Sequence, residues 1–395
     1  FETVAEDSAV KRTIDKGYQY LLMEAAHQAD ERDHGGQTED ADRDAAAQEA
    51  LGVLVVEDSP IMRKILISML NADEHIRVVG TAKNGEEALE QLETLKPDII
   101  SLDVNMPVMN GSTALKHIMI KNPCPVVIMS NLGSAAHQTI IDFLNLGAVD
   151  FMSKPIKSGN ILVQQQKIVE RVHRAATARI DRFRRTRALP LSEEPAVAVP
   201  DAPTCSGLTL LNVGPGGFGD LTAFFTQLPA DFSSAVVVLQ SLPPALMDAL
   251  ADYFNRRCHL PVVPLADNSP LACGHCYLAT NGRAMRFTQG DGRTLLQLET
   301  ETEAGGLAVD NPVDDILSGA AEAFGERLTA AFLSGAEIGT LDGVRTVRAK
   351  GGRVVAADPK TAVLDDALET LVDNNLVDEV ISPTEIITPF LSCKA

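Results

Sequence analysis

Five polar side chains stand where short apolar segments in the first part of the sequence begin or end. They are Glu57 and Asp58 after residues 51–56, Asp103 after residues 98–102, Ser130 after residues 125–129, and Lys154 before Pro155. In an open parallel α/β sheet the carboxyl ends of the strands share one edge, and ligands bind there. We therefore expect these side chains to converge on a single site.

The residue types at this site suit the binding of a metal ion and a phosphate group. Glu57, Asp58 and Asp103 together favour a hard cation such as Mg²⁺, with the backbone carbonyl of Asn105 as a further oxygen ligand. The metal implies a phosphate group. Asp103 is the candidate nucleophile for a phosphoryl group, while Mg²⁺, the Ser130 hydroxyl and the Lys154 ammonium offset the charge on the phosphoryl oxygens.

The spacing of these residues resembles the receiver domain of two-component response regulators over residues 51–175. The segments that carry the resemblance are Glu57-Asp58, Asp103-Val-Asn-Met-Pro107, Met129-Ser130 and Phe151-Met-Ser-Lys-Pro155. The resemblance implies phosphorylation at Asp103, a hydroxyl residue that moves toward the phosphate, and Phe151 as the aromatic switch residue. A coincidental cluster of acids at strand ends is the alternative, and five matching residue types disfavour it.

Composition limits the classes of protein to which the chain could belong. A length of 395 residues suits two or three domains, and a net charge of −20 disfavours nucleic-acid binding. We expect a cytoplasmic protein without membrane insertion, because no run of eighteen apolar residues and no signal-peptide core occurs. The start at Phe1 suggests that this sequence is not the whole gene product. Six cysteines do not indicate a disulfide framework here.

Residues 1–50 form an acidic extension that carries no candidate chemistry. Apolar residues recur at helical spacing between residues 9 and 29, and a polar acidic run covers residues 30–44. We interpret them as a helix followed by a flexible tether. The helix could cover an apolar patch of its own chain or dock on a partner, and both readings stay open.

Residues 159–187 have the pattern of one long helix, and its later half is rich in arginine. It is expected to be the last helix of the receiver, continuing as a connector through residues 176–205 together with the proline- and alanine-rich linker at 189–204. The basic face of this helix would either be exposed to solvent or bind the acidic arm at residues 30–44.

Residues 206–390 again alternate apolar runs with helical patterns, which predicts a second doubly wound α/β domain. Strands are expected at residues 208–213, 235–239, 261–265, 276–279, 294–298, 330–333 and 354–357. Helices are expected from residue 220, at 314–324 and at 342–349. The fold class is therefore two Rossmann-like domains, a flavodoxin-like receiver and an effector domain, preceded by a helical extension.

The second domain resembles the catalytic domain of the chemotaxis receptor methylesterases. The matching segments are Leu242-Pro-Pro244, Gly274-His-Cys-Tyr-Leu-Ala279 and Leu333-Ser-Gly335. The resemblance also places the family's catalytic serine, histidine and aspartate at Gly216, Ser241 and Gly339. Asp342 comes into register only with an insertion. No serine lies between Gly207 and Asp231, so we expect the triad to be lost.

Three other chemistries are conceivable for the second domain. Gly214-Pro-Gly-Gly-Phe-Gly219 fits a dinucleotide loop, but no acid for a ribose ends the following strand at Gln240-Ser241. Cys273-Gly-His-Cys276 has redox spacing, and together with Cys258 and His259 it could hold zinc. A hydrolase that uses Ser241 or Ser334 is disfavoured, because no histidine is placed to serve either one.

The sequence thus predicts a response regulator with a degenerate effector domain that acts by binding protein. Its expected cofactor is Mg²⁺, and its expected partners are a histidine kinase and chemoreceptors or chemosensory signalling proteins, with self-association left open. The main rival is an active protein-glutamate methylesterase that demethylates chemoreceptors.

Overall fold

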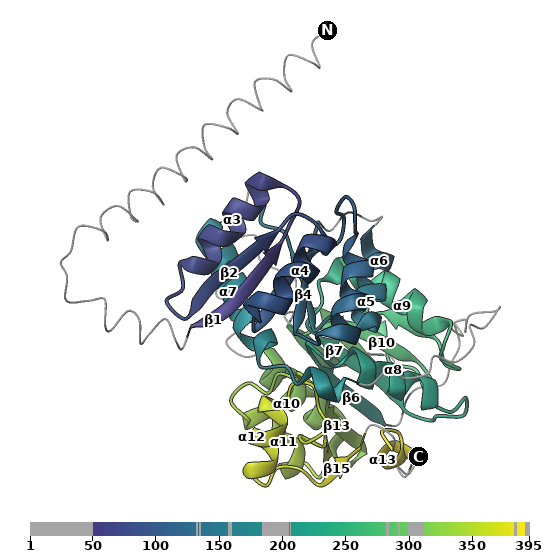
Figure 1. Ribbon diagram of the computed structural model, residues 1–395. Coiled ribbons are helices and arrows are strands. Elements are labelled where there is room, and N and C mark those ends of the chain that lie inside the picture. Colours follow the sequence, from purple (N-terminus) through teal and green to yellow (C-terminus); the bar gives the residue numbers. More distant parts are fainter. Residues whose placement is uncertain are drawn as a thin grey trace.

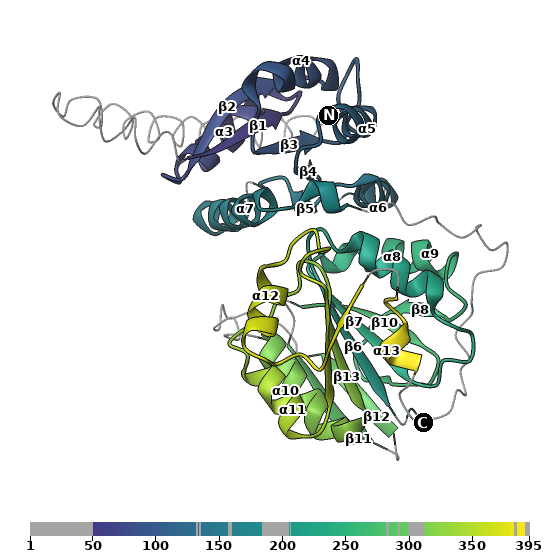
Figure 2. The ribbon, with the colours of Figure 1, turned by 60° about the horizontal axis from the view of Figure 1, so that its bottom comes forward.

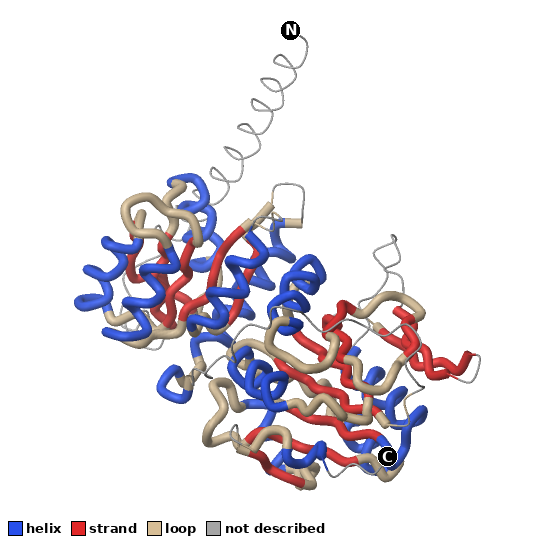
Figure 3. Tube along the Cα trace, turned by 90° about the vertical axis from the view of Figure 1, so that its right-hand side faces the viewer, coloured by secondary structure: helices blue, strands red, loops and turns tan. Residues whose placement is uncertain are grey.

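A computed structural model of the chain describes residues 50–391, apart from 132, 134–135, 157–159, 184–204, 206, 282–283, 291–292, 299–311 and 383–384. The expected N-terminal helix and acidic tether, and the linker at residues 189–204, lie outside the described residues. Two α/β domains follow one another along the rest of the chain, each with a sheet between layers of helices (Figures 1 and 3).

The first domain is built on a parallel sheet with the strand order β2-β1-β3-β4-β5. Its strands are β1 (Leu51–Val56), β2 (Ile76–Ala82), β3 (Ile99–Asp103), β4 (Val126–Ser130) and β5 (Asp150–Ser153). Helices α3 (Pro60–Asn71) and α7 (Ile161–Ala176) pack together, while α4 (Gly85–Leu95), α5 (Gly111–Lys121) and α6 (His137–Leu146) contribute to the core on the other face.

The helices of this domain begin where the sequence supplies capping side chains. Ser59 accepts a hydrogen bond from the backbone N–H of Met62 and precedes Pro60, a residue suited to the first turn. Asn84, Asn110 and Asn160 cap α4, α5 and α7 in the same way. The caps of α3 and α5 follow within a few residues of the acidic strand ends, so they fix the loops that carry the candidate site.

The second domain has a seven-stranded parallel sheet with the order β15-β14-β13-β6-β7-β10-β8. These strands are β6 (Leu208–Val213), β7 (Ala235–Gln240), β8 (Val262–Pro264), β10 (Cys276–Thr280), β13 (Leu328–Phe332), β14 (Arg353–Ala357) and β15 (Glu379–Ile381). A small antiparallel sheet adds β9 (Ser269–Pro270), β11 (Met285–Gly290) and β12 (Arg293–Leu298).

Six helices of the described part of this domain surround the larger sheet. They are α8 (Phe218–Gln227), α9 (Met247–Asn255), α10 (Pro312–Phe324), α11 (Asp342–Ala349), α12 (Asp366–Asp373) and α13 (Thr388–Leu391). The two doubly wound domains expected from the sequence are therefore confirmed. The short strands β9 and β15, and the hairpin partner β11, were not expected.

The prediction of one helix across residues 159–187 is wrong at its C-terminal end. Helix α7 stops at Ala176, where the Thr177 hydroxyl donates to the carbonyl of Arg174 at 2.9 Å. A single 3-10 turn, η2 (Ile180–Arg182), follows. The backbone N–H of Arg179 donates to the carbonyl of Val363 in the second domain, so tertiary contacts rather than helical periodicity shape this connector.

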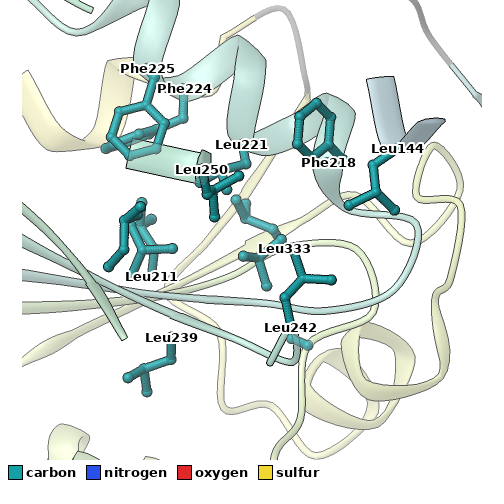
Figure 4. Packing of buried hydrophobic residues seen from close by; sticks show 14 of the residues in the cluster. Leu144, Leu211, Phe218, Leu221, Phe224, Phe225, Leu239, Leu242, Leu250 and Leu333 are labelled. Atoms are coloured by element: carbon teal, nitrogen blue, oxygen red, sulfur yellow. The ribbon is translucent and has the colours of Figure 1, made fainter. Parts of the chain in front are cut away.

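The edge of the first domain formed by α6, β5 and α7 faces α8, α9 and α12 of the second domain (Figure 2). Leu144 of α6 is buried beside Phe218 of α8 (Figure 4). The Tyr253 hydroxyl of α9 donates to Asn145 of α6 at 3.0 Å. The carboxyl-terminal part of the first domain is thus the part that touches the second.

Candidate functional site

The structure brings the predicted acidic side chains together at the carboxyl edge of the first sheet. One ligand oxygen each from Glu57, Asp58 and Asp103 lie within 4.8 Å of one another. Glu57 and Asp103 are buried and Asp58 is exposed. Each residue stands where β1 or β3 ends, so the strand ends fix the spacing of the carboxylates.

Lys154 reaches this cluster from the loop after β5. Its ammonium nitrogen lies 2.8 Å from Glu57 Oε2 and 2.9 Å from Asp103 Oδ2, and only 10% of its side chain is exposed. Ser130, at the end of β4, is buried and its hydroxyl donates to the carbonyl of Asn131 at 3.4 Å. The Asn105 N–H donates to Asp103 Oδ1 at 3.4 Å.

Burial sets the protonation behaviour of the two central groups. It raises the pKa of Glu57, and the nearby charge of Asp103 acts in the same direction while Lys154 opposes it. Burial alone lowers the pKa of Lys154, but its hydrogen bonds and charge interactions with Glu57 and Asp103 outweigh that effect and raise the pKa overall. The lysine is therefore held as a cation between two carboxylates.

An open cleft of about 580 Å³ lies above these residues. Glu57, Asp58, Asp103, Ser130 and Lys154 all line it. Closely spaced carboxylate oxygens are the donor set that Mg²⁺ prefers, so the residues fit this ion. The cleft combines oxygen ligands for a cation with a hydroxyl and an ammonium group for an anion, which is the chemistry of phosphoryl transfer.

Phe151 lies in β5, three residues before Lys154, and its side chain is completely buried. The carbonyl of Phe151 accepts a hydrogen bond from Arg171 of α7 at 2.6 Å. Its neighbour Asp150 is also buried, which raises the pKa of that carboxyl, while the charge of Arg171 acts to lower it. The same arginine donates to the carbonyl of Ser241 in the second domain at 2.9 Å.

Gly216 follows β6 in the second domain and has a φ of +76°. Its N–H donates to the carbonyl of Val149 in the first domain at 2.7 Å. A Cβ atom built on Gly216 would lie 2.9 Å from Val363 Cγ1 and 3.5 Å from the Ser334 hydroxyl oxygen. The backbone conformation and the close neighbours both favour glycine at this position.

Gly216 and Ser241 line one cavity between the two domains, together with Val149 and Asp150. The cavity encloses only about 30 Å³, which is room for a water molecule or two. No larger molecule fits between the domains at this point in the described structure.

Gly339 follows β13 in the loop that leads to α11, and it has a φ of +53°. A Cβ atom there would lie 2.4 Å from Asp314 Oδ2. Asp314 is buried and accepts hydrogen bonds from the N–H groups of Thr340 and Gly343 at 2.6 and 2.9 Å. Asp342 points elsewhere, since it is exposed and pairs with Arg345 at 3.0 Å.

The cysteines do not gather into a metal site within the described part of the chain. Glu57, Asp58 and Asp103 form the one set of three His, Cys, Asp or Glu ligands found there. The two cysteines of the Cys273–Cys276 segment contact different partners: the Cys276 thiol hydrogen-bonds with Cys258, and Cys273 with Cys205. Cys205 belongs to no sequence motif, so its contact with Cys273 is visible only in the structure.

The arginines of the connector were expected to serve solvation or to bind the acidic arm. Three of them, Arg171, Arg174 and Arg182, hydrogen-bond to the second domain, while the acidic arm lies outside the described residues. Their positive charge was visible in the sequence, but their backbone acceptors were not. Among the described helices, none is both long and apolar enough to cross a membrane.

Comparison with known proteins gives the same two-part division. The response regulator receiver domain family matches residues 53–165, and the CheB methylesterase family matches residues 210–389. A protein-glutamate methylesterase/protein-glutamine glutaminase of Oleidesulfovibrio alaskensis is 31% identical over 353 residues, covering 83% of this chain and 95% of that protein. A relative of the same name from Pseudomonas putida, of its group 1 operon, is 32% identical over 365 residues, covering 85% and 97%.

A solved structure, the response regulator domain of Thermotoga maritima CheB, is 39% identical to this chain. It covers 32% of this chain and 96% of its own length, with a TM-score of 0.30.

Proposed function

The chain belongs to the CheB methylesterase family of response regulators, and from this premise we propose that it is a phosphorylation-controlled regulator whose second domain binds protein without hydrolysing it. Its partners would be a histidine kinase and chemoreceptors or other chemosensory signalling proteins in the cytoplasm. The geometry at positions 216 and 339 is the observation that carries the second half of this proposal.

Phosphorylation is assigned to Asp103. A carboxylate oxygen of Asp103 would form the new bond to phosphorus while the bond between phosphorus and the donor nitrogen breaks, and the electron pair of that bond stays with the donor. Lys154 lies 2.9 Å from Asp103 and would balance the charge on the phosphoryl oxygens. Ser130, on the neighbouring strand β4, would supply a hydroxyl on the same edge.

Glu57, Asp58, Asp103 and the backbone carbonyl of Asn105 would hold Mg²⁺. When bound, this ion supplies positive charge that offsets the phosphoryl oxygens. The protein's part is to keep three carboxylates within 4.8 Å of one another and to hold Lys154 protonated beside two of them.

Two observations support a binding role for the second domain. The resemblance puts the family's nucleophile at Gly216, where a side chain would meet Val363, and its aspartate at Gly339, where a side chain would meet Asp314. Loss of a triad leaves catalysis of only about 10³ to 10⁴ over water, from binding and the oxyanion hole.

An active methylesterase is the second candidate, because the family model covers residues 210–389 and the two relatives carry that activity in their names. The two candidates differ in whether hydrolysis products are released. Methylated receptor is incubated with the chain, with and without a small phosphodonor and Mg²⁺, and released methanol and ammonia are measured.

We expect release far slower than that catalysed by the Pseudomonas putida relative, which serves as the positive control. In the same samples the chain should gain one acid-labile phosphoryl group, and Asp103→Ala should gain none. Methanol release at a rate similar to that of the relative, abolished by a substitution in residues 206–390, would establish the enzyme instead. Phosphoryl labelling that survives Asp103→Ala would overturn the assignment of the phosphorylation site.

A further inference from the structure

We propose that the second domain carries a binding site for arginine side chains, beside the positions where the family's triad stands, and that the connector occupies this site from within the chain. The inference deepens the proposed function, because it names the chemistry of the partner that the second domain would bind. Three arginines of α7 and η2 define the site: Arg171, Arg174 and Arg182.

Arg174 makes the fullest set of contacts. Its guanidinium donates to the carbonyls of Gly335 and Ala336 at 2.5 and 3.0 Å, and to the Glu337 carboxylate at 3.2 Å. These acceptors belong to the loop after β13. The two carbonyls and the carboxylate are arranged around one planar cation, which matches the fork of a guanidinium better than the point charge of an ammonium group.

Arg182 meets acceptors of the same kinds after the neighbouring strand β14. Its guanidinium donates to the carbonyls of Pro359 and Ala362 at 2.8 and 3.1 Å, and to the Asp365 carboxylate at 2.7 Å. A carboxylate with two backbone carbonyls thus occurs twice, in two different loops. All three of the Arg182 bonds come from one nitrogen, Nη1, so the recurrence argues for recognition of a cation by both loops, while the use of both guanidinium arms is carried by Arg174.

Arg171 joins this set to the first domain. It donates to the Ser241 carbonyl, in the loop after β7, and also to the Phe151 carbonyl beside the phosphorylation site. The loops after β7, β13 and β14 all lie at the carboxyl edge of the second sheet, where open α/β sheets bind ligands. The three arginines therefore occupy the ligand-binding edge of that sheet.

Charge favours a cationic occupant as well. Residues 206–395 contain 24 Asp and Glu but only 12 Lys and Arg, so the second domain attracts positive charge. An acidic partner would be repelled by the same surface. We therefore assign the site to a helical segment of a partner protein that presents two arginines three residues apart, as Arg171 and Arg174 are, with a third beyond the helix end.

The test uses a fluorescent peptide of residues 161–183 and the full chain with Arg171→Gln, Arg174→Gln and Arg182→Gln, which vacates the site. Fluorescence anisotropy measures binding. We expect saturable binding that is at least about tenfold tighter than to the wild-type chain, where the connector occupies the site. The same peptide with its three arginines replaced by glutamine, or by lysine, should bind at least about tenfold more weakly.

Arg179→Gln provides a matched control chain, because Arg179 lies in the same connector and its exposed side chain forms no hydrogen bond or ion pair within the described residues. This chain should bind the peptide as weakly as wild type. If the triple variant does not fold, the single variant Arg174→Gln allows the same comparison.

Equal binding of the arginine and glutamine peptides, or no binding to any vacated chain, would overturn the proposal. Equal binding of the lysine peptide would also overturn it, since the site would then select charge and not guanidinium. No phosphate is present in this experiment, so its failure leaves the phosphorylation of Asp103 untouched.

Discussion

The backbone N–H of Gly216 donates a 2.7 Å hydrogen bond to the carbonyl oxygen of Val149. Val149 immediately precedes β5, which carries Phe151 and leads to Lys154. The loop that the family resemblance matches to the catalytic serine is therefore tied directly to the strand that leads to Lys154. We therefore expect a change around Asp103 to reach the second domain in part through this bond.

Phosphorylation of Asp103 should alter amide hydrogen exchange in residues 130–154 and across the facing loops of the second domain. A bound phosphate biases a surface only if it favours one arrangement of Ser130 and Phe151 over another. Ser130→Ala should weaken this response but still allow phosphorylation, because the hydroxyl is not among the expected metal ligands. Identical hydrogen exchange in the phosphorylated and unphosphorylated chain would mean that the protein is a constitutive scaffold that does not respond to phosphorylation.

Gly216→Ser should lower the free energy of unfolding by about 1–3 kcal/mol and should not restore hydrolysis. The φ of +76° is unfavourable for serine, and its Cβ would lie 2.9 Å from Val363. Chemical denaturation of the full chain measures the change. Gly274→Ser isolates the backbone effect, because Gly274 has a φ of +67° but no atom nearer than 3.4 Å to its built Cβ. A Gly216→Ser chain as stable as wild type would refute the packing argument.

Asp150→Asn should change how stability depends on pH. Burial raises the pKa of Asp150 above its ordinary value of 3.8 in the folded chain, so the folded state holds this proton more tightly than the unfolded state. The stabilising effect of that proton is present at low pH and is lost as pH rises from 3.8 through the raised value. The Tm of wild type relative to Asp150→Asn should therefore fall from pH 4 to pH 7. A relative Tm that rises with pH would contradict this sign.

Protein purified without added metal should contain no stoichiometric zinc. Cys258 pairs with Cys276 and Cys205 pairs with Cys273, so these thiols form two separate contacts instead of one ligand set. Elemental analysis of the purified chain measures this directly. One zinc per chain that disappears in Cys273→Ser would show that the pairs rearrange into a metal site.

The candidate phosphorylation site could be predicted because its chemistry is local to strand ends. A polar residue that ends an apolar run, as Asp103 and Ser130 do, reports both the strand and the edge at which it stops. Strands β6, β7 and β14 could be predicted in the same way, because each is a run of mostly apolar residues with a recognisable end. Strand β15 has only three residues and begins with Glu379, so it lacks the flanking apolar run that marks the equally short β8.

The end of α7 and the role of its arginines could not be predicted. Ile180 and Phe183 continue the helical spacing of apolar residues, yet Phe183 lies against Gly147 and the chain bends at Thr177 to reach it. The partners of Arg171, Arg174 and Arg182 are mostly backbone carbonyls of distant loops. A carbonyl is present in every residue, so no sequence pattern distinguishes the ones that bind an arginine.

Arg171 contacts the Phe151 carbonyl and the Ser241 carbonyl with one guanidinium group. If phosphorylation at Asp103 weakens this shared contact, any partner that takes over the second domain's surface must weaken it too. Thermodynamic linkage then requires reciprocity: the factor by which phosphorylation raises the partner's affinity is the factor by which the bound partner favours the phosphorylated form. A bound partner would therefore stabilise the phosphorylated form of the receiver, which is the form that binds the partner more tightly.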